Sequence, residues 1–143
     1  MNDIHNLQRF VMAQEHQYEL VVQELAKGRK RGHWMWYIFP QIAGLGMSAT
    51  AKKYEIESLL EAVAYGDHPL LGSRLKECTR LVNDVDDKTA REIFGYPDNL
   101  KFRSCMTLFA KATQEGLFTA ALDKYYDGKP DELTLNILES QDA

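Results

Sequence analysis

The sequence predicts an all-α protein, a compact single-domain multihelical fold of six to eight helices with one long ordered aromatic loop. Apolar residues recur at three- and four-residue steps through most of the 143-residue chain. Serine or threonine followed three residues later by glutamate, a helix-start signal, occurs at the ends of such patterns. Only Trp34 to Phe39 has strong strand propensity, and one strand cannot form a sheet.

The first helical pattern covers residues 4–26, where it ends before Gly28, a residue typical of the position after a helix. Residues 29–47 contain three glycines and Pro40. This composition predicts an ordered loop with room for one short helical turn. One or two helices are expected over residues 48–66, with Ser48 and Ser58 as candidate caps.

Pro69 suits the first turn of the next helix. Thr89 with Glu92 has the spacing of a capping box, and Asp98 and Asp131 are candidate caps for later helices. The remaining helices are therefore expected from 68 to about 85, from 89 to about 95, over 99–113, over 117–127 and from 131 to about 138.

Composition and charge indicate an ordinary globular chain. One domain, 1–143, with a core over about 4–139, is the natural expectation for this length. The net charge of −4 does not indicate nucleic-acid binding, and no apolar run approaches the ~20 residues of a membrane span. Cys78 and Cys105 form no C-x-x-C pair, and the N-terminus lacks signal-peptide features. We therefore expect a cytoplasmic protein with two core thiols.

A basic run interrupts the acidic balance just before the aromatic segment. Lys27, Arg29, Lys30, Arg31 and His33 fall within seven residues that also include two glycines. Glycines let backbone N–H groups approach a phosphate and the cations supply charge, so this run is a candidate anion site. The alternative is a solvated basic connector at a helix end, which is the commoner role of a charge run.

The aromatic run combines flat apolar faces with polar tips, which suits stacking on a nucleobase or sugar. The alternative is that most of the run fills the core. We expect partial burial, with Trp36 or Tyr37 as the wall of a pocket and Trp34 and Trp36 buried unequally. His33, between the cations and the aromatics, is a candidate acid or base near neutral pH, although such a residue more often only makes a hydrogen bond.

A second candidate anion site lies at the start of the helix expected over 99–113. Lys101, Arg103 and Ser104 are close to the free N–H groups and the positive end of that helix dipole. The alternative is that Asp98 caps the helix and the two cations are surface or ion-paired residues.

Catalytic groups are less clearly marked. No G-x-S-x-G motif is present and Cys105 falls in an apolar stripe, so no nucleophile is indicated. Spacing does not choose among the carboxylates for acid–base work, and no third residue completes a metal set, so we expect no metal and no cofactor. The candidate carboxylates are Glu15, Glu19, Glu24 and Asp98.

Five stretches together resemble the bacterial domain-of-unknown-function 1810 family, whose members are often labelled calpastatin-like. They are LQRFVMAQ, HWMWYIFPQIAGLG, HPLLGSRLKECT, IFGYPDNLKFRSCMTLF and DELTLNIL. The resemblance extends from Leu7 to Leu138 and implies a single helical domain with an Rv1873-like fold, without implying a function. Calpastatin inhibitory segments are disordered, whereas this chain is patterned for a packed core. The stretch RSCMTLFAKA is also similar to a helix of the NADAR (YbiA-like) proteins, which act on ADP-ribose-type N-glycosides.

These features predict a pocket for a phosphate-bearing, nucleotide-derived small molecule, with hydrolysis of an N-glycosidic bond as the reaction to test first. The alternative is a non-catalytic protein-interaction module or homodimer that uses the aromatic loop. The catalytic candidates are His33, Glu15 and Asp98. The predicted ligand-binding residues are Lys30, His33, Trp34, Trp36, Tyr37, Gln41, Lys101, Arg103 and Ser104.

Overall fold

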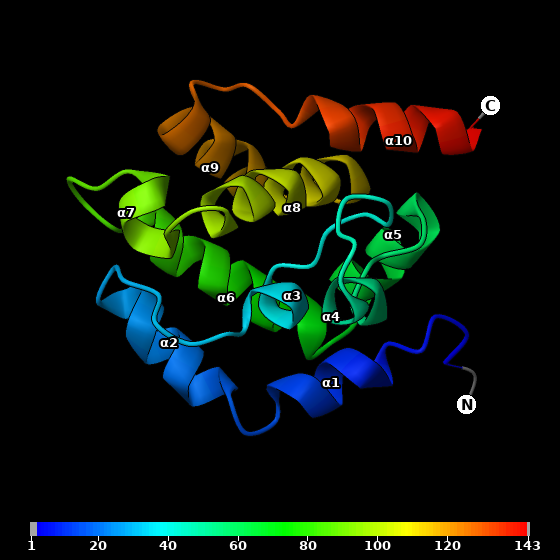
Figure 1. Cartoon of the computed structure of the whole chain (residues 1–143), viewed down its shortest axis with the longest axis horizontal. Helices are drawn as coiled ribbons and strands as arrows, with labels where there is room; N and C mark the ends of the chain where they lie inside the picture. Colours follow the sequence, from blue (N-terminus) through cyan, green and yellow to red (C-terminus); the bar gives the residue numbers. More distant parts are fainter. Residues whose placement is uncertain (1–2, 143) are drawn as a thin grey trace.

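The computed structural model describes residues 3–142, which form ten α-helices and no strand (Figure 1). One isolated parallel bridge pairs Ile42 with Ile56. The helices are α1 Gln8–Gln14, α2 Tyr18–Ala26, α3 Met35–Ile38, α4 Ala49–Lys53, α5 Leu59–Asp67, α6 Leu71–Asn83, α7 Ala90–Phe94, α8 Asp98–Ala112, α9 Gly116–Tyr126 and α10 Glu132–Asp142. The all-α prediction is confirmed, although six to eight helices was too low a number. Residues 1, 2 and 143 of the predicted domain lie outside the described residues.

The difference in number comes from short helices that periodicity alone merges or omits. The pattern over 4–26 is two helices, because the polar run Gln14 to Gln17 interrupts the apolar stripe and the chain turns there. The aromatic loop contains the single helical turn α3, so its strand propensity is not expressed. Residues 48–66 form both α4 and α5.

Most predicted helix starts are confirmed by hydrogen bonds. Ser48 Oγ accepts from the Ala51 amide at 3.1 Å, and Ser58 Oγ accepts from the Glu61 amide at 3.2 Å. The Thr89 capping box is complete, with both reciprocal bonds to Glu92 present. These caps satisfy backbone donors that a helix cannot pair internally.

Helix α8 is the centre of the packing, with α5, α7, α9 and α10 against it (Figure 1). Its apolar stripe is buried together with the polar side chains of Ser104 and Thr107. A helix surrounded on this many sides presents only its ends and a narrow face to solvent. The first two turns of α8 therefore supply the part of this helix that can contribute to a surface site.

Within the described residues no helix combines the length and hydropathy that a membrane crossing requires. The longest, α8, has 15 residues and carries charged side chains near both ends. A span needs ~20 predominantly apolar residues.

One guanidinium joins α1 to the segment between α4 and α5. Arg9 donates to the carbonyl oxygens of Lys53 at 2.8 Å and Glu55 at 2.7 Å. It also forms an ion pair with Glu61, with 2.9 Å between Nη2 and Oε2. The two paired side chains are only 13% and 2% exposed, so the charges are largely removed from water and depend on each other.

We expect Arg9→Ala to lower the free energy of unfolding by about 3–5 kcal/mol, because the Glu61 carboxylate would remain buried without its cation. Urea denaturation at neutral pH measures this change. The exposed Arg29 provides a matched control, and Arg29→Ala should change stability by less than about 0.5 kcal/mol. A loss below about 1 kcal/mol in Arg9→Ala would show that the ion pair is not a main support of α1.

Candidate functional site

The carboxylate of Glu24 in α2 fixes the beginning of the aromatic loop. Its Oε1 accepts hydrogen bonds from the backbone amides of Arg31 at 2.8 Å and Gly32 at 3.0 Å, and from the Trp34 indole at 2.8 Å. Burial raises the pKa of Glu24, but these three donors and the charge of Lys30 outweigh burial and hold the pKa below its usual value. The sequence marked Glu24 as a candidate carboxylate for acid–base work. Because its carboxylate is occupied by these hydrogen bonds, we assign it a structural role.

A second carboxylate, Asp98, ties the loop to the start of α8. Its two oxygens pair with Lys30 Nζ at 2.8 Å and with Lys101 Nζ at 3.2 Å. The predicted cap role of Asp98 is wrong, because the cap position is Pro97 and Asp98 is the first helical residue. The side chain is instead held by two cations from different segments, so it is not free to act as a base.

The aromatic run divides between core and surface, as predicted. The side chains of Trp34 and Phe39 are completely buried, whereas those of Trp36 and Tyr37 are half-buried. The Lys101 ammonium lies 4.8 Å from the ring centroid of Trp36, within cation–π distance. Tyr37 turns toward α4, where its ring centroid is 5.4 Å from that of Tyr54. Trp36 is therefore the tryptophan that a ligand can reach.

Trp36 forms one wall of a cleft of about 510 Å³ between the aromatic loop, the loop before α4 and the first turns of α8 and α10. Five of the nine predicted ligand-binding residues line it, from segments more than fifty residues apart. Its walls are mostly apolar, and its polar groups are few. The lining residues are Trp36, Gln41, Leu45, Gly46, Met47, Ser48, Ala51, Pro97, Leu100, Lys101, Arg103, Ser104, Asp131 and Leu133.

The cation best placed to meet a ligand is Arg103. Its Nε donates to the Lys129 carbonyl at 2.9 Å, and its guanidinium carbon lies 5.4 Å from the ring centroid of Tyr126. These contacts fix the plane of the guanidinium, and its terminal amino groups donate no hydrogen bond to the described residues. The Lys101 ammonium, by contrast, already forms an ion pair with Asp98. Arg103 therefore keeps donor capacity that a bidentate anion could use.

The other predicted site residues lie outside the cleft. Lys30 is held by Asp98 and by the Gly32 carbonyl, and Trp34 is in the core. His33 is exposed beside the basic run, and Tyr37 packs against α4. Glu15 is exposed where α1 ends. Of the first candidate anion site, Lys30 is paired with Asp98, and the other basic residues are exposed outside the cleft. The second candidate site contributes Lys101, Arg103 and Ser104 to the cleft.

Sequence reasoning missed Asp131 as a cleft residue, although its predicted role as the cap of α10 is confirmed. Its Oδ2 accepts from the Thr134 amide at 3.1 Å and from the Thr134 hydroxyl at 2.6 Å. The apolar lining from Met47, Leu100 and Leu133 was also missed. For Leu100 a signal was available, because Pro97, Leu100 and Ser104 recur at helical spacing.

Both cysteines are buried in the core, as predicted. Burial raises the pKa of Cys78 to about 12 and the pKa of Cys105 well above its ordinary value. A thiol that stays protonated is a poor nucleophile, so neither is a candidate for covalent catalysis.

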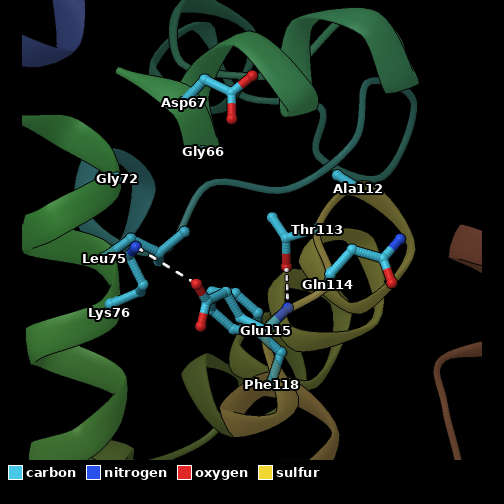
Figure 2. A pocket seen from close by; sticks show the side chains of 10 residues that line it. All are labelled: Gly66, Asp67, Gly72, Leu75, Lys76, Ala112, Thr113, Gln114, Glu115 and Phe118. Carbon is cyan, nitrogen blue, oxygen red and sulfur yellow. Dashed lines mark hydrogen bonds and ion pairs between the residues drawn. The ribbon is translucent and has the colours of Figure 1, made fainter. Parts of the chain in front are cut away.

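A second hollow, of about 310 Å³, lies between α6 and the junction of α8 and α9 (Figure 2). Its polar groups mainly bind one another: Lys76 Nζ is 3.6 Å from Glu115 Oε1, and the Glu115 amide donates to Thr113 Oγ1. Gly72 at its wall is required by packing, because a Cβ there would lie 2.1 Å from the Gly66 carbonyl oxygen. The hollow offers few converging groups, and we assign it no role.

The fold and the cleft beside Trp36 define a small all-helical protein with an aromatic and charged surface cleft. Residues 4–138 match a family described as "Protein of unknown function (DUF1810)", and the chain belongs to this family. The structure is similar to the crystal structure of the conserved hypothetical protein Rv1873 from Mycobacterium tuberculosis, with a TM-score of 0.95. The two chains are 55% identical, and the match covers 96% of this chain and 99% of that one.

No curated protein matches the chain. The predicted resemblance to the 1810 family is confirmed. The similarity to NADAR proteins and the calpastatin-like label stay predictions.

We expect Glu24→Gln to lower the free energy of unfolding by about 1.5–3 kcal/mol at pH 7, because hydrogen bonds to a charged acceptor are replaced. The folded pKa of Glu24 lies below its ordinary value of 4.5. The stability contributed by the carboxylate is therefore complete above the pKa of the unfolded chain and is lost as pH falls through the folded pKa.

Urea denaturation from pH 7 to pH 3 tests both points. The difference in the free energy of unfolding between wild type and Glu24→Gln should be constant near neutral pH and should become smaller in the acid range. The exposed Glu15 gives the control, since Glu15→Gln should stay within about 0.5 kcal/mol of wild type. A difference that does not change with pH would contradict the role of the charge.

Proposed function

We propose that the cleft beside Trp36 binds a small anionic molecule that combines a planar ring with a phosphate group, as nucleotide-derived ligands do. The observation that carries the proposal is the convergence of Trp36, Gln41, Lys101, Arg103 and Ser104 on one cleft of about 510 Å³. Ligand pockets are typically about 300–1,000 Å³, mostly apolar, with a few convergent polar groups. The described cleft has this size and this balance.

The two halves of such a ligand would meet different walls. The half-exposed Trp36 offers a ring face for stacking, and the nearby Gln41 amide offers a donor and an acceptor for a ring edge. Arg103 offers its terminal amino groups to the phosphate, and Lys101 adds charge at longer range. The Asp98 carboxylate already offsets part of the Lys101 charge, so Arg103 is the main anion contact of the proposal.

Hydrolysis of an N-glycosidic bond stays a prediction about the same cleft. His33 and Glu15 do not line it, and Asp98 is paired with two lysines. Asp131 is the carboxylate that does line it, and its Oδ2 is occupied by hydroxyl and amide donors. We therefore propose binding, and Asp131 is the residue through which catalysis would be tested.

Apolar side chains around the cleft support a second candidate, a homodimer. Met47 is 80% exposed and Leu133 is 63% exposed, and both line the cleft. Large exposed apolar residues grouped together often mark a protein interface. Sedimentation equilibrium separates the two candidates: a dimer that Leu133→Lys disrupts supports the interface, and a monomer at all concentrations removes it.

We expect ADP to quench the fluorescence of Trp36, because the base would stack on the half-exposed indole. In Trp36→Phe the remaining tryptophan, Trp34, is fully buried, so ADP should cause little quenching even where it still binds. Fluorescence titration, with calorimetry to follow binding independently, measures both effects. Equal quenching in wild type and Trp36→Phe would show that the ligand does not reach Trp36.

We expect Arg103→Gln to weaken ADP binding by about ten- to a hundredfold, since a hydrogen bond to a charged group contributes about 1.5–3 kcal/mol. The exposed Arg80 on α6 provides the matched control, and Arg80→Gln should bind ADP as wild type does. A bound ligand at a hundred times its dissociation constant adds about 2.7 kcal/mol to stability. Absence of any thermal shift with ADP, ADP-ribose, NAD and sugar phosphates would overturn the proposed function.

A further inference from the structure

Asp131 is the acidic group of a cleft that otherwise contributes cations. Its Oδ2 accepts hydrogen bonds from Ser104 Oγ at 3.1 Å and from both the amide and the hydroxyl of Thr134. Its other oxygen, Oδ1, accepts no hydrogen bond and forms no ion pair with the described residues. An ionised carboxylate has about four acceptor sites, so Asp131 retains acceptor capacity beside the cleft.

This carboxylate is held in place from several directions. The Asp131 amide donates to Thr107 Oγ1 at 2.8 Å, and Thr107 is only 1% exposed. Thr134 is fully buried and Ser104 is 5% exposed. A polar group whose partners are themselves buried cannot easily turn away, so Asp131 is fixed before any ligand arrives.

Ser104 adds a second acceptor next to Asp131. Its single hydroxyl proton has two acceptors, the Leu100 carbonyl and Asp131 Oδ2, both at 3.1 Å. The proton is therefore engaged within the protein, and the oxygen lone pairs of Ser104 remain for a ligand donor. Two adjacent acceptors need a ligand that presents adjacent donors.

Charge decides which donors fit. A phosphate group is predominantly dianionic at neutral pH and would be repelled by the Asp131 carboxylate. A ligand ammonium would pair with Asp131 but would be repelled by Arg103 and Lys101, which line the same cleft. Neutral hydroxyl groups donate without either repulsion. A sugar diol attached to a phosphate offers hydroxyl donors to Asp131 and Ser104 and negative charge to Arg103.

Resting on the proposed function, we infer that Asp131 and Ser104 select the sugar of the ligand, so that the cleft takes ribonucleoside phosphates with free 2′- and 3′-hydroxyl groups. The ring would lie on Trp36 and the phosphate would meet Arg103. The ribose hydroxyls would then donate to Asp131 and Ser104. A ligand that lacks these hydroxyls would leave the fixed Asp131 carboxylate without a hydrogen-bond donor.

Calorimetric titration of wild type with ADP and with 2′,3′-dideoxy-ADP tests the inference. We expect ADP to bind about ten- to a hundredfold more tightly, because the lost hydrogen bonds involve a charged acceptor. In Asp131→Asn this preference should fall to about threefold or less, because an amide replaces the carboxylate. Asparagine caps helices as well as aspartate does, so the variant should keep α10 and its melting temperature.

The neighbouring Glu132 is exposed and lies outside the cleft, so Glu132→Gln controls for the loss of one negative charge and should keep the wild-type preference. Equal binding of the two nucleotides by wild type would overturn the inference and leave the proposed function standing. A preference that persists in Asp131→Asn would remove Asp131 from sugar selection. Absence of binding by either nucleotide would overturn the inference, and the proposed function would fall with it if ADP-ribose, NAD and sugar phosphates also gave no thermal shift.

Discussion

The three hydrogen bonds accepted by Glu24 are the constraint on which the aromatic loop depends. A loop that lies over a core has amide groups that no helix or strand pairs, and each one left unpaired and buried is costly. The Arg31 and Gly32 amides and the Trp34 indole meet this need at one oxygen atom. Gly32 is required there, since a Cβ at this position would lie 2.8 Å from Trp34 Cδ1. The loop can therefore follow only a path that buries Trp34.

Burying Trp34 has a direct effect on the cleft. Trp34 is the cap residue of the turn α3, in which Met35 and Ile38 are also buried, so Trp36 and Tyr37 are left on the outer side of the turn. The turn α3 thus places Trp36 against the first turns of α8, where Lys101 lies over its ring. Asp98 holds the same two segments together by pairing with Lys30 and Lys101. The wall of the cleft is in this sense a consequence of the packing of the core.

The sequence predicts the parts of this arrangement that local chemistry determines. Caps at Ser48, Ser58 and Thr89 and the unequal burial of the two tryptophans follow from spacing within a few residues. The role of Asp98 could not be predicted in this way. Its pairing with Lys30 joins groups 68 positions apart in the sequence. The Asp98 carboxylate could have capped its own helix, but it pairs with the distant Lys30. Only the folded structure determines which of these two partners it has.

The same reasoning distinguishes the cations of the basic run from those of the cleft. A cation can attract a ligand anion only to the extent that the protein has not already neutralised it. Lys30 is almost completely buried and shared with Asp98, so its charge contributes to folding. The guanidinium of Arg103 is held by a carbonyl and an aromatic ring, which orient it without offsetting its charge. The number of cations in a segment therefore does not show how much charge is available to a ligand, whereas the kind of partner that each cation has does.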